Sequence, residues 1–337
     1  MSKLTSRVSC LVLGLLAACG PEPDLVVYVA HDQVHAEPLL RQFERETGLT
    51  VDVAYDTETN KTIGHVNRIR AEEDRVRCDV FWNNEVGHTV ALANEGRLAS
   101  YASPNASGIP ATFRDPESRW FGFGARARVF IVNTNEVDPA EIQTMWDLVD
   151  PRWEGRVGMA RPLTGTTLTH MAALFDVMGE AEALRYLEEI KSRNERGLLD
   201  LTSGNATLMR KVRDGALAFG WTDTDDFNVA LQEGFPVALV TPDQGGIGTM
   251  LIPNTIMILK GAPHRANAER FVDWVLREEF EATLAESRSA QIPVRASVPR
   301  PEHVVDTGAI RVMDVDYEAV GSALPARQEL LQEMFLD

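Results

Sequence analysis

The stretch WFGFGARARVFIVNTN (120–135) is long, extended and apolar, and the pattern of the chain changes there. A segment of this kind can leave one sheet and enter another, so it predicts two α/β lobes joined by a crossing strand. TMLIPNTIMILKG (249–261) is the candidate for a second strand, crossing back to the first lobe. Two lobes joined in this way leave a cleft at the carboxyl ends of the strands, where open α/β sheets bind their ligands.

Upstream of this stretch, short strands alternate with amphipathic helices. LVVYVA (25–30), LTVDVAYD (49–56) and CDVFW (78–82) are predicted strands, and the segments between them carry apolar residues at helical spacing. Short connections in such an alternation indicate an open, mostly parallel sheet flanked by helices. The second half repeats the alternation and ends in helices. We assign residues 24–125 plus 248–305 to lobe 1 and 126–247 plus 306–337 to lobe 2.

The N-terminus, MSKLTSRVSCLVLGLLAACG, reads as a bacterial lipoprotein signal. Lys3 and Arg7 precede an apolar run, and LAAC ends at Cys19. We expect residues 1–18 to be a signal peptide, Cys19 to carry lipid and residues 19–24 to form a tether. An ordinary signal peptide or a membrane anchor is the alternative, although the apolar run is short for a span. The prediction is an extracytoplasmic, periplasmic protein held on a membrane by lipid.

Charge and cysteine usage narrow the function classes. The 337 residues carry a formal net charge of -17, which argues against a nucleic-acid partner, whose phosphates call for a basic face. Only one cysteine, Cys78, remains beyond the signal and the lipobox, so the mature chain has no intramolecular disulfide. We expect Cys78 to be a buried core thiol.

Four segments, in this order, resemble the ferric-iron type of ABC-transporter solute-binding proteins: RWFGFGARARVFIVNTNEV, LVDPRWEGRVGMA, FVDWVLREEFEATLAES and AQIPV. The likeness covers nearly all of the mature chain. It implies a two-lobed periplasmic-binding-protein fold of type II, hinge closure on a ligand, and delivery to an ABC permease with its ATPase subunit. It also implies transport rather than catalysis, and we expect a monomer.

The chain departs from that family where the ligand would bind. The family has two adjacent tyrosines after the strand matching GALAFG, and their phenolates bind Fe(III). Here Asp225 and Asp226 stand in that place, and Val132 replaces a further tyrosine. The expected histidine is matched only loosely, by His31 or Asp32. The resemblance therefore carries over the scaffold but not the tyrosinate site.

Candidate ligand residues follow the ends of four predicted strands, where a cleft should form. Carboxylates, amides and a histidine make up the first set: His31, Asp32, Asp56, Glu58, Asn83, Asn84, Glu85, Asp223, Asp225 and Asp226. Glycine-flanked helix starts and two glutamines supply possible anion or secondary contacts: Thr166, Thr167, Asn205, Gln244 and Gln291. The competing interpretation is structural, with the aspartates and Asn84 acting as helix caps and Asp56 lying in a solvated turn.

Oxygen-only donors favour a hard cation, and we expect Fe(III), Mn(II) or Ca(II) as the transported ligand, with no catalytic cofactor. A bound cation would also offset the repulsion among the three aspartates. An organic amine, a polyamine or an aminophosphonate is the alternative cargo, since carboxylates also suit an ammonium group. A metal-dependent hydrolase is a third interpretation, but the chain contains neither G-x-S-x-G nor H-E-x-x-H.

Overall fold

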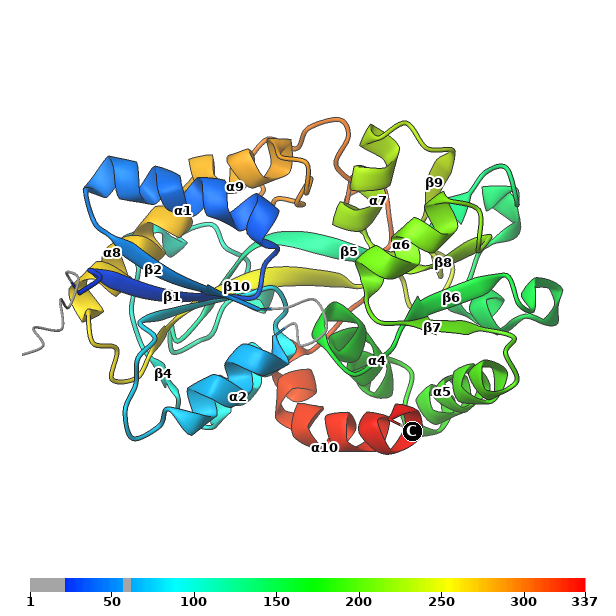
Figure 1. Ribbon diagram of the computed structural model, residues 1–337, viewed down its shortest axis with the longest axis horizontal. Helices are drawn as coiled ribbons and strands as arrows, with labels where there is room; N and C mark the ends of the chain where they lie inside the picture. The colour runs from blue at the N-terminus through cyan, green and yellow to red at the C-terminus, as the bar shows by residue number, and fades with distance from the viewer. Residues whose placement is uncertain (1–21, 57–61, 337) are drawn as a thin grey trace, which may run out of the picture.

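Strand β5 (Phe121–Asn133) is shared by both lobes, as its length and composition predict. Its first half pairs antiparallel with β10 (Leu251–Leu259), and its second half pairs antiparallel with β8 (Phe219–Asp223) and β9 (Val237–Val240). The changeover falls between Ala127 and Arg128. The computed structural model describes residues 22–56 and 62–336 (Figure 1). The signal peptide and Cys19 therefore lie outside the described residues.

The first lobe is built on three parallel strands. β1 (Leu25–Val29) pairs with β2 (Val51–Tyr55) and with β3 (Val80–Asn83), and β10 adds antiparallel to β3 and to the short β4 (Leu98–Ala99). Five helices accompany this sheet: α1 (Gln33–Thr47), α2 (Ile63–Ala71), α3 (Gly87–Asn94), α8 (Arg265–Val275) and α9 (Glu278–Glu286). In Figure 1, α1, α8 and α9 lie over one face of the sheet and α2 lies on the other.

The second lobe repeats the plan with β6 (Val157–Ala160) in the middle, parallel to β7 (Asp200–Thr202) and β8. Its helices are α4 (Gly165–Val177), α5 (Glu180–Glu195), α6 (Asn205–Arg213) and α7 (Thr224–Gln232). The strand order through both lobes is β2-β1-β3-β10-β5-β8-β6-β7. The predicted α/β fold is confirmed, with the qualification that the crossing strands are antiparallel to their neighbours while the centre of each lobe is parallel.

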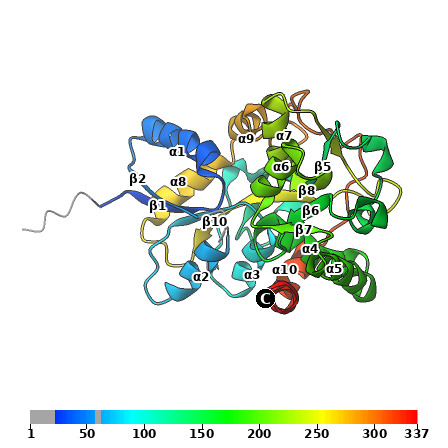
Figure 2. The same ribbon diagram turned by 45° about the vertical axis from the view of Figure 1, so that its right-hand side comes forward.

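Helix α10 (Tyr317–Phe335) lies beneath both lobes in Figure 1. It packs against α3 of lobe 1 and α4 of lobe 2, and Figure 2 shows the three helices together. Buried Val320, Leu324 and Leu331 belong to one apolar cluster that includes residues of both lobes. The core is therefore continuous across the lobe junction on this side.

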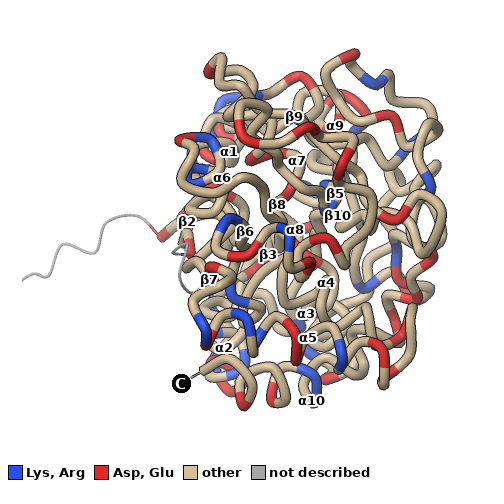
Figure 3. Tube along the Cα trace, turned by 90° about the vertical axis from the view of Figure 1, so that its right-hand side faces the viewer, with Lys and Arg blue, Asp and Glu red and all other residues tan. Residues whose placement is uncertain are grey.

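No helix of the described part of the chain is long and apolar enough to cross a membrane. Along the trace in Figure 3, acidic and basic residues are interspersed.

Candidate functional site

A small, partly open cavity lies at the junction of the lobes, at the carboxyl ends of their strands. Its volume is about 30 Å³, and Asp32 after β1, Asn84 after β3, Ala160 at the end of β6 and Asp223 at the end of β8 all line it. The remaining lining residues are Arg126, Thr164, Gly165, Thr166, Thr167, Gly204, Asn205, Asp225 and Asp226. The position is the one at which open α/β sheets bind their ligands.

Three helices begin at this cavity. Thr164, Gly204 and Asp223 precede α4, α6 and α7, and none of these three residues caps its helix with a side-chain hydrogen bond. The first N–H groups of a helix carry partial positive charge and have no intrahelical acceptor. Carboxylates placed here are therefore stabilised before any ligand arrives.

Asp223 makes the densest set of contacts in the cavity. Its Oδ1 accepts from Arg128 Nη1 at 2.6 Å, and its Oδ2 accepts from Thr166 Oγ1 at 2.6 Å and from Asn205 Nδ2 at 3.0 Å. Burial acts to raise the pKa of Asp223, but the guanidinium groups of Arg128 and Arg126 and the Thr166 hydroxyl outweigh it and hold that pKa below its ordinary value. Asp223 is thus a charged, well-satisfied group.

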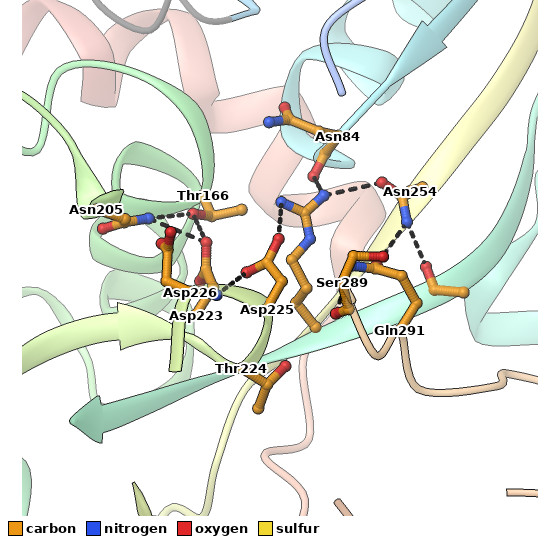
Figure 4. A network of polar contacts seen from close by, with 12 residues as sticks. Asn84, Thr166, Asn205, Asp223, Thr224, Asp225, Asp226, Asn254, Ser289 and Gln291 are labelled. Carbon is orange, nitrogen blue, oxygen red and sulfur yellow. Dashed lines mark hydrogen bonds and ion pairs between the residues drawn. The ribbon is translucent and has the colours of Figure 1, made fainter. Parts of the chain in front are cut away.

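Asp225 and Asp226 complete a cluster of three carboxylates at the start of α7. One oxygen from each of Asp223, Asp225 and Asp226 lies within 4.8 Å of the others, close enough for a single metal ion to contact all three. Asp225 Oδ1 accepts from the backbone N–H of Asp226, and Asp226 Oδ2 accepts from Thr222 Oγ1, each at 3.0 Å. Figure 4 shows the three carboxyl groups gathered beside Thr166 and Asn205.

Two buried arginines that the sequence-based prediction missed face these carboxylates from β5. Arg128 lies opposite Asp223 in the β5–β8 register, and Arg126, two residues earlier, places Nη1 3.6 Å from Asp225 Oδ2. Both are almost fully buried, with 2% and 1% of Arg126 and Arg128 exposed. The signal was available, since two charges at alternate positions of an otherwise apolar strand have to find buried partners.

These arginines correct the expectation that a bound cation must offset the aspartates' repulsion. Arg128 neutralises Asp223, and Arg126 lies near Asp225, so the protein supplies part of the balancing charge itself. Two guanidinium groups against three carboxylates still leave these five residues with a net negative charge.

Several of the other candidates reach the cavity. Asp32, Asn84, Thr166, Thr167 and Asn205 line it. The backbone carbonyl of Asn84 accepts from Arg126 Nη2 at 2.9 Å, and its side-chain oxygen accepts from Thr62 Oγ1 at 2.7 Å.

Glu85, Asp56 and His31 are not among the lining residues. Glu85 is fully buried and accepts from Thr169 Oγ1 at 2.6 Å and from the ring Nδ1 and backbone N–H of His88, so it joins the start of α3 to α4. Its pKa is pulled up by burial, but the contacts with His88, Thr169 and Asn83 hold it below its ordinary value. Asp56 accepts from the backbone N–H of His65, and His31 stacks on Trp82. Glu58 lies outside the described residues.

The two glutamines have structural partners. Gln244 donates to Thr249 Oγ1 and accepts from the backbone N–H of Arg311, away from the cavity. Gln291 is buried, and its Oε1 accepts from Asn254 Nδ2 at 2.9 Å. Asn254 Oδ1 in turn accepts from Arg126 Nη2, so Gln291 lies two contacts behind the cavity wall. Cys78, as expected, is a buried thiol.

Comparisons with known proteins agree with this architecture. A family model described as "Bacterial extracellular solute-binding protein" matches residues 39–312. Iron uptake protein A1 of Synechocystis is 25% identical over 95% of this chain and 92% of its own length. These matches confirm the resemblance to iron-type binding proteins.

Solved structures of the same fold include a ferric binding protein and a protein with a sugar phosphate bound. The ferric binding protein from Campylobacter jejuni has a TM-score of 0.82 at 20% identity, covering 92% of this chain and 99% of that one. The periplasmic binding protein AfuA from Actinobacillus pleuropneumoniae, with fructose-6-phosphate bound, has a TM-score of 0.81 at 22% identity, covering 93% and 98%. The fold therefore does not choose the ligand. The family model matches most of this chain, and the two-lobed architecture agrees with it. The chain therefore belongs to the bacterial extracellular solute-binding protein family.

Proposed function

We propose that this protein is the solute-binding component of an ABC importer and that it captures a hard metal cation, ferric iron foremost, in the cavity between its lobes. The observation that carries the proposal is the cluster of Asp223, Asp225 and Asp226, whose oxygens lie within 4.8 Å of one another at the lobe junction. The lobes close on the ion by hinge motion about the crossing strands. A permease with its ATPase then receives the cargo, and the protein performs no chemistry on it.

The donor set supports a metal of the hard class. Aspartate, amide and threonine hydroxyl oxygens line the cavity, and such donors suit Fe(III), Mn(II) or Ca(II) better than soft thiophilic ions. The relatives named for iron support iron among these. No tyrosine lines the cavity within the described residues, so the proposed site is built from carboxylates rather than phenolates.

The cavity volume supports the metal over the organic alternatives. At about 30 Å³ the cavity has room for an ion with one or two waters, since one water needs about 10–15 Å³. Pockets for organic ligands are typically about 300–1,000 Å³. A polyamine or an aminophosphonate would need more room than this cavity offers in the present conformation.

We also propose that the mature protein begins at a lipidated Cys19 and acts as a monomer outside the cytoplasm. The support is the lipobox LAAC and the family's extracellular placement. If a Cys19→Ser variant remains as firmly membrane-bound as the parent, the lipid anchor is wrong.

The test of function is a metal titration of protein purified without chelator. Wild type should bind one equivalent of ferric ion, released from its nitrilotriacetate complex, or of Mn(II) supplied as chloride. Asp225→Asn and Asp226→Asn keep side-chain size but remove a charge, and each should weaken binding by about two to three decades. Asp56→Asn is the matched control, because Asp56 does not line the cavity, and it should bind like wild type.

Two outcomes contradict the proposal. One is a wild-type protein that binds no metal but releases an organic amine or zwitterion on denaturation, which would favour the alternative cargo. The other is metal binding that survives both substitutions within about threefold, which would place the site elsewhere.

A further inference from the structure

We propose that Arg126 is a tethered counter-cation that competes with the cargo for Asp225 and so lowers the metal affinity of the site. This inference rests on the proposed function, because it concerns the same cavity. It assigns Arg126 as an affinity-determining residue, whereas the carboxylates are the ligands.

Arg126 is fixed in place by acceptors other than its carboxylate. Nη2 donates to the backbone carbonyl of Asn84 at 2.9 Å and to Asn254 Oδ1 at 2.8 Å. Asn254 is held in turn by Gln291 and by the backbone carbonyl of Gly124. All of these partners belong to lobe 1 or to its end of β5, and Figure 4 shows Asn84, Asn254 and Gln291 on the side of the network opposite Asn205. The guanidinium is therefore anchored to lobe 1 while its charge is directed at Asp225 of lobe 2.

The two arginines of β5 differ in how they meet their carboxylates. Arg128 Nη1 makes a hydrogen-bonded ion pair with Asp223 at 2.6 Å, alongside Thr166 and Asn205. Arg126 Nη1 stands 3.6 Å from Asp225 Oδ2, beyond hydrogen-bond distance, and its Nε has no hydrogen-bond partner within the described part of the chain. The first pair is structural, whereas the second leaves a positive charge close to Asp225 without a hydrogen bond to it.

A metal ion that contacts Asp225 must lie near this charge. Arg126 is 2% exposed, so water screens its guanidinium charge poorly. Its two lobe 1 acceptors prevent the guanidinium from swinging away as the ion enters. Like-charge repulsion then acts against every cation in the site, and Arg126 partly fills the electrostatic role of the cargo when the site is empty.

The experiment compares Arg126→Gln and Arg126→Lys in the Mn(II) and ferric titrations. Removing the charge in Arg126→Gln should raise the affinity by about tenfold or more, and should lower the melting temperature of the metal-free protein because Asp225 loses the nearby guanidinium charge. Arg126→Lys keeps the charge but lacks the guanidinium fork that contacts Asn84 and Asn254, so it should raise the affinity less than Arg126→Gln does. Asn254→Ala keeps the charge but frees it to move, and should give a smaller gain in affinity than Arg126→Gln.

Arg295→Gln is the matched control for stability. Arg295 is equally buried and pairs with Glu281 at 3.0 Å, but it does not line the cavity, so its loss should lower the melting temperature without changing metal affinity. Unchanged affinity in Arg126→Gln would show a structural role only, and weakened affinity would show that Arg126 holds part of the ligand. Either result overturns the inference while wild-type binding upholds the proposed function. If wild type binds no metal, both fall together.

Discussion

The buried carboxylates of the cavity are stabilised by specific neighbours, whereas the half-buried carboxylate of Asp243 has few hydrogen-bond donors around it. Asp243 is half-buried, with Asp147 nearby, and among the described residues its carboxylate accepts one hydrogen bond, from the backbone N–H of Met145 at 3.0 Å. Burial raises the pKa of Asp243 to about 6, and the charge of Asp147 adds to the rise, whereas the Met145 hydrogen bond opposes it. At neutral pH this carboxylate is therefore charged at a cost in folding free energy.

Asp243→Asn should remove that cost. Because the folded pKa is raised, the carboxyl group destabilises the fold increasingly as pH rises from its ordinary value of 3.8 through about 6. The variant should be more stable than wild type by about 1–2 kcal/mol at pH 7.5, and the difference should vanish near pH 4. Asparagine retains an oxygen for Met145 and tolerates the positive φ of 60° at this position. Urea unfolding at the two pH values tests it, and an equal difference at both would mean that the titration of Asp243 is not the cause.

The residues of the site could be predicted from the sequence only in part. The three aspartates and the helix starts at Thr166 and Asn205 were predictable, because strand ends and helix starts have local signatures. Arg126 and Arg128 were missed because the strand ARARVFIV was assigned from its apolar residues, without asking which groups its two charges would pair with. Glu85 does not line the cavity, and its hydrogen bond with Thr169, from a helix of the other lobe, is a contact that no local pattern indicates.

At the level of elements, the crossing strands and one helix pair determine how the lobes meet. β5 and β10 were predictable from length and composition, since few strands are apolar for so long. The place of α10 was not, because an amphipathic helix shows which face is buried but not against what. Its docking depends on Gly321, where a Cβ would lie 2.3 Å from Val90 Cβ and 3.0 Å from the backbone oxygen of Gly87, both in α3.

Gly321→Ala should therefore destabilise the protein even though alanine is the better helix former by about 1 kcal/mol. Separating α10 from α3 to make room should produce a net loss of about 1–3 kcal/mol in urea unfolding. Gly245→Ala is the matched control, because an added Cβ there meets nothing within 4 Å. A Gly321→Ala protein as stable as wild type would mean that the two helices are not in close contact.

At the scale of the whole molecule, two features govern the cleft. The lobes are linked by β5 and β10, and the acidic cavity lies at their junction. Beneath the lobes, α10 packs against α3 of lobe 1 and α4 of lobe 2. The two-lobed fold could be predicted from the alternation of strands and helices together with the crossing strand. The size of the cavity could not, because it depends on how side chains from both lobes fill the junction.

The most direct test of the proposed metal site is the position of the metal in crystals grown with Mn(II) or ferric ion, located by anomalous diffraction on both sides of the metal's absorption edge. We predict a single strong peak in the interlobe cavity, about 2.0–2.6 Å from carboxylate oxygens of Asp223, Asp225 or Asp226. A peak bound elsewhere on the protein, or full occupancy of this cavity by an organic molecule with no anomalous signal, would contradict it.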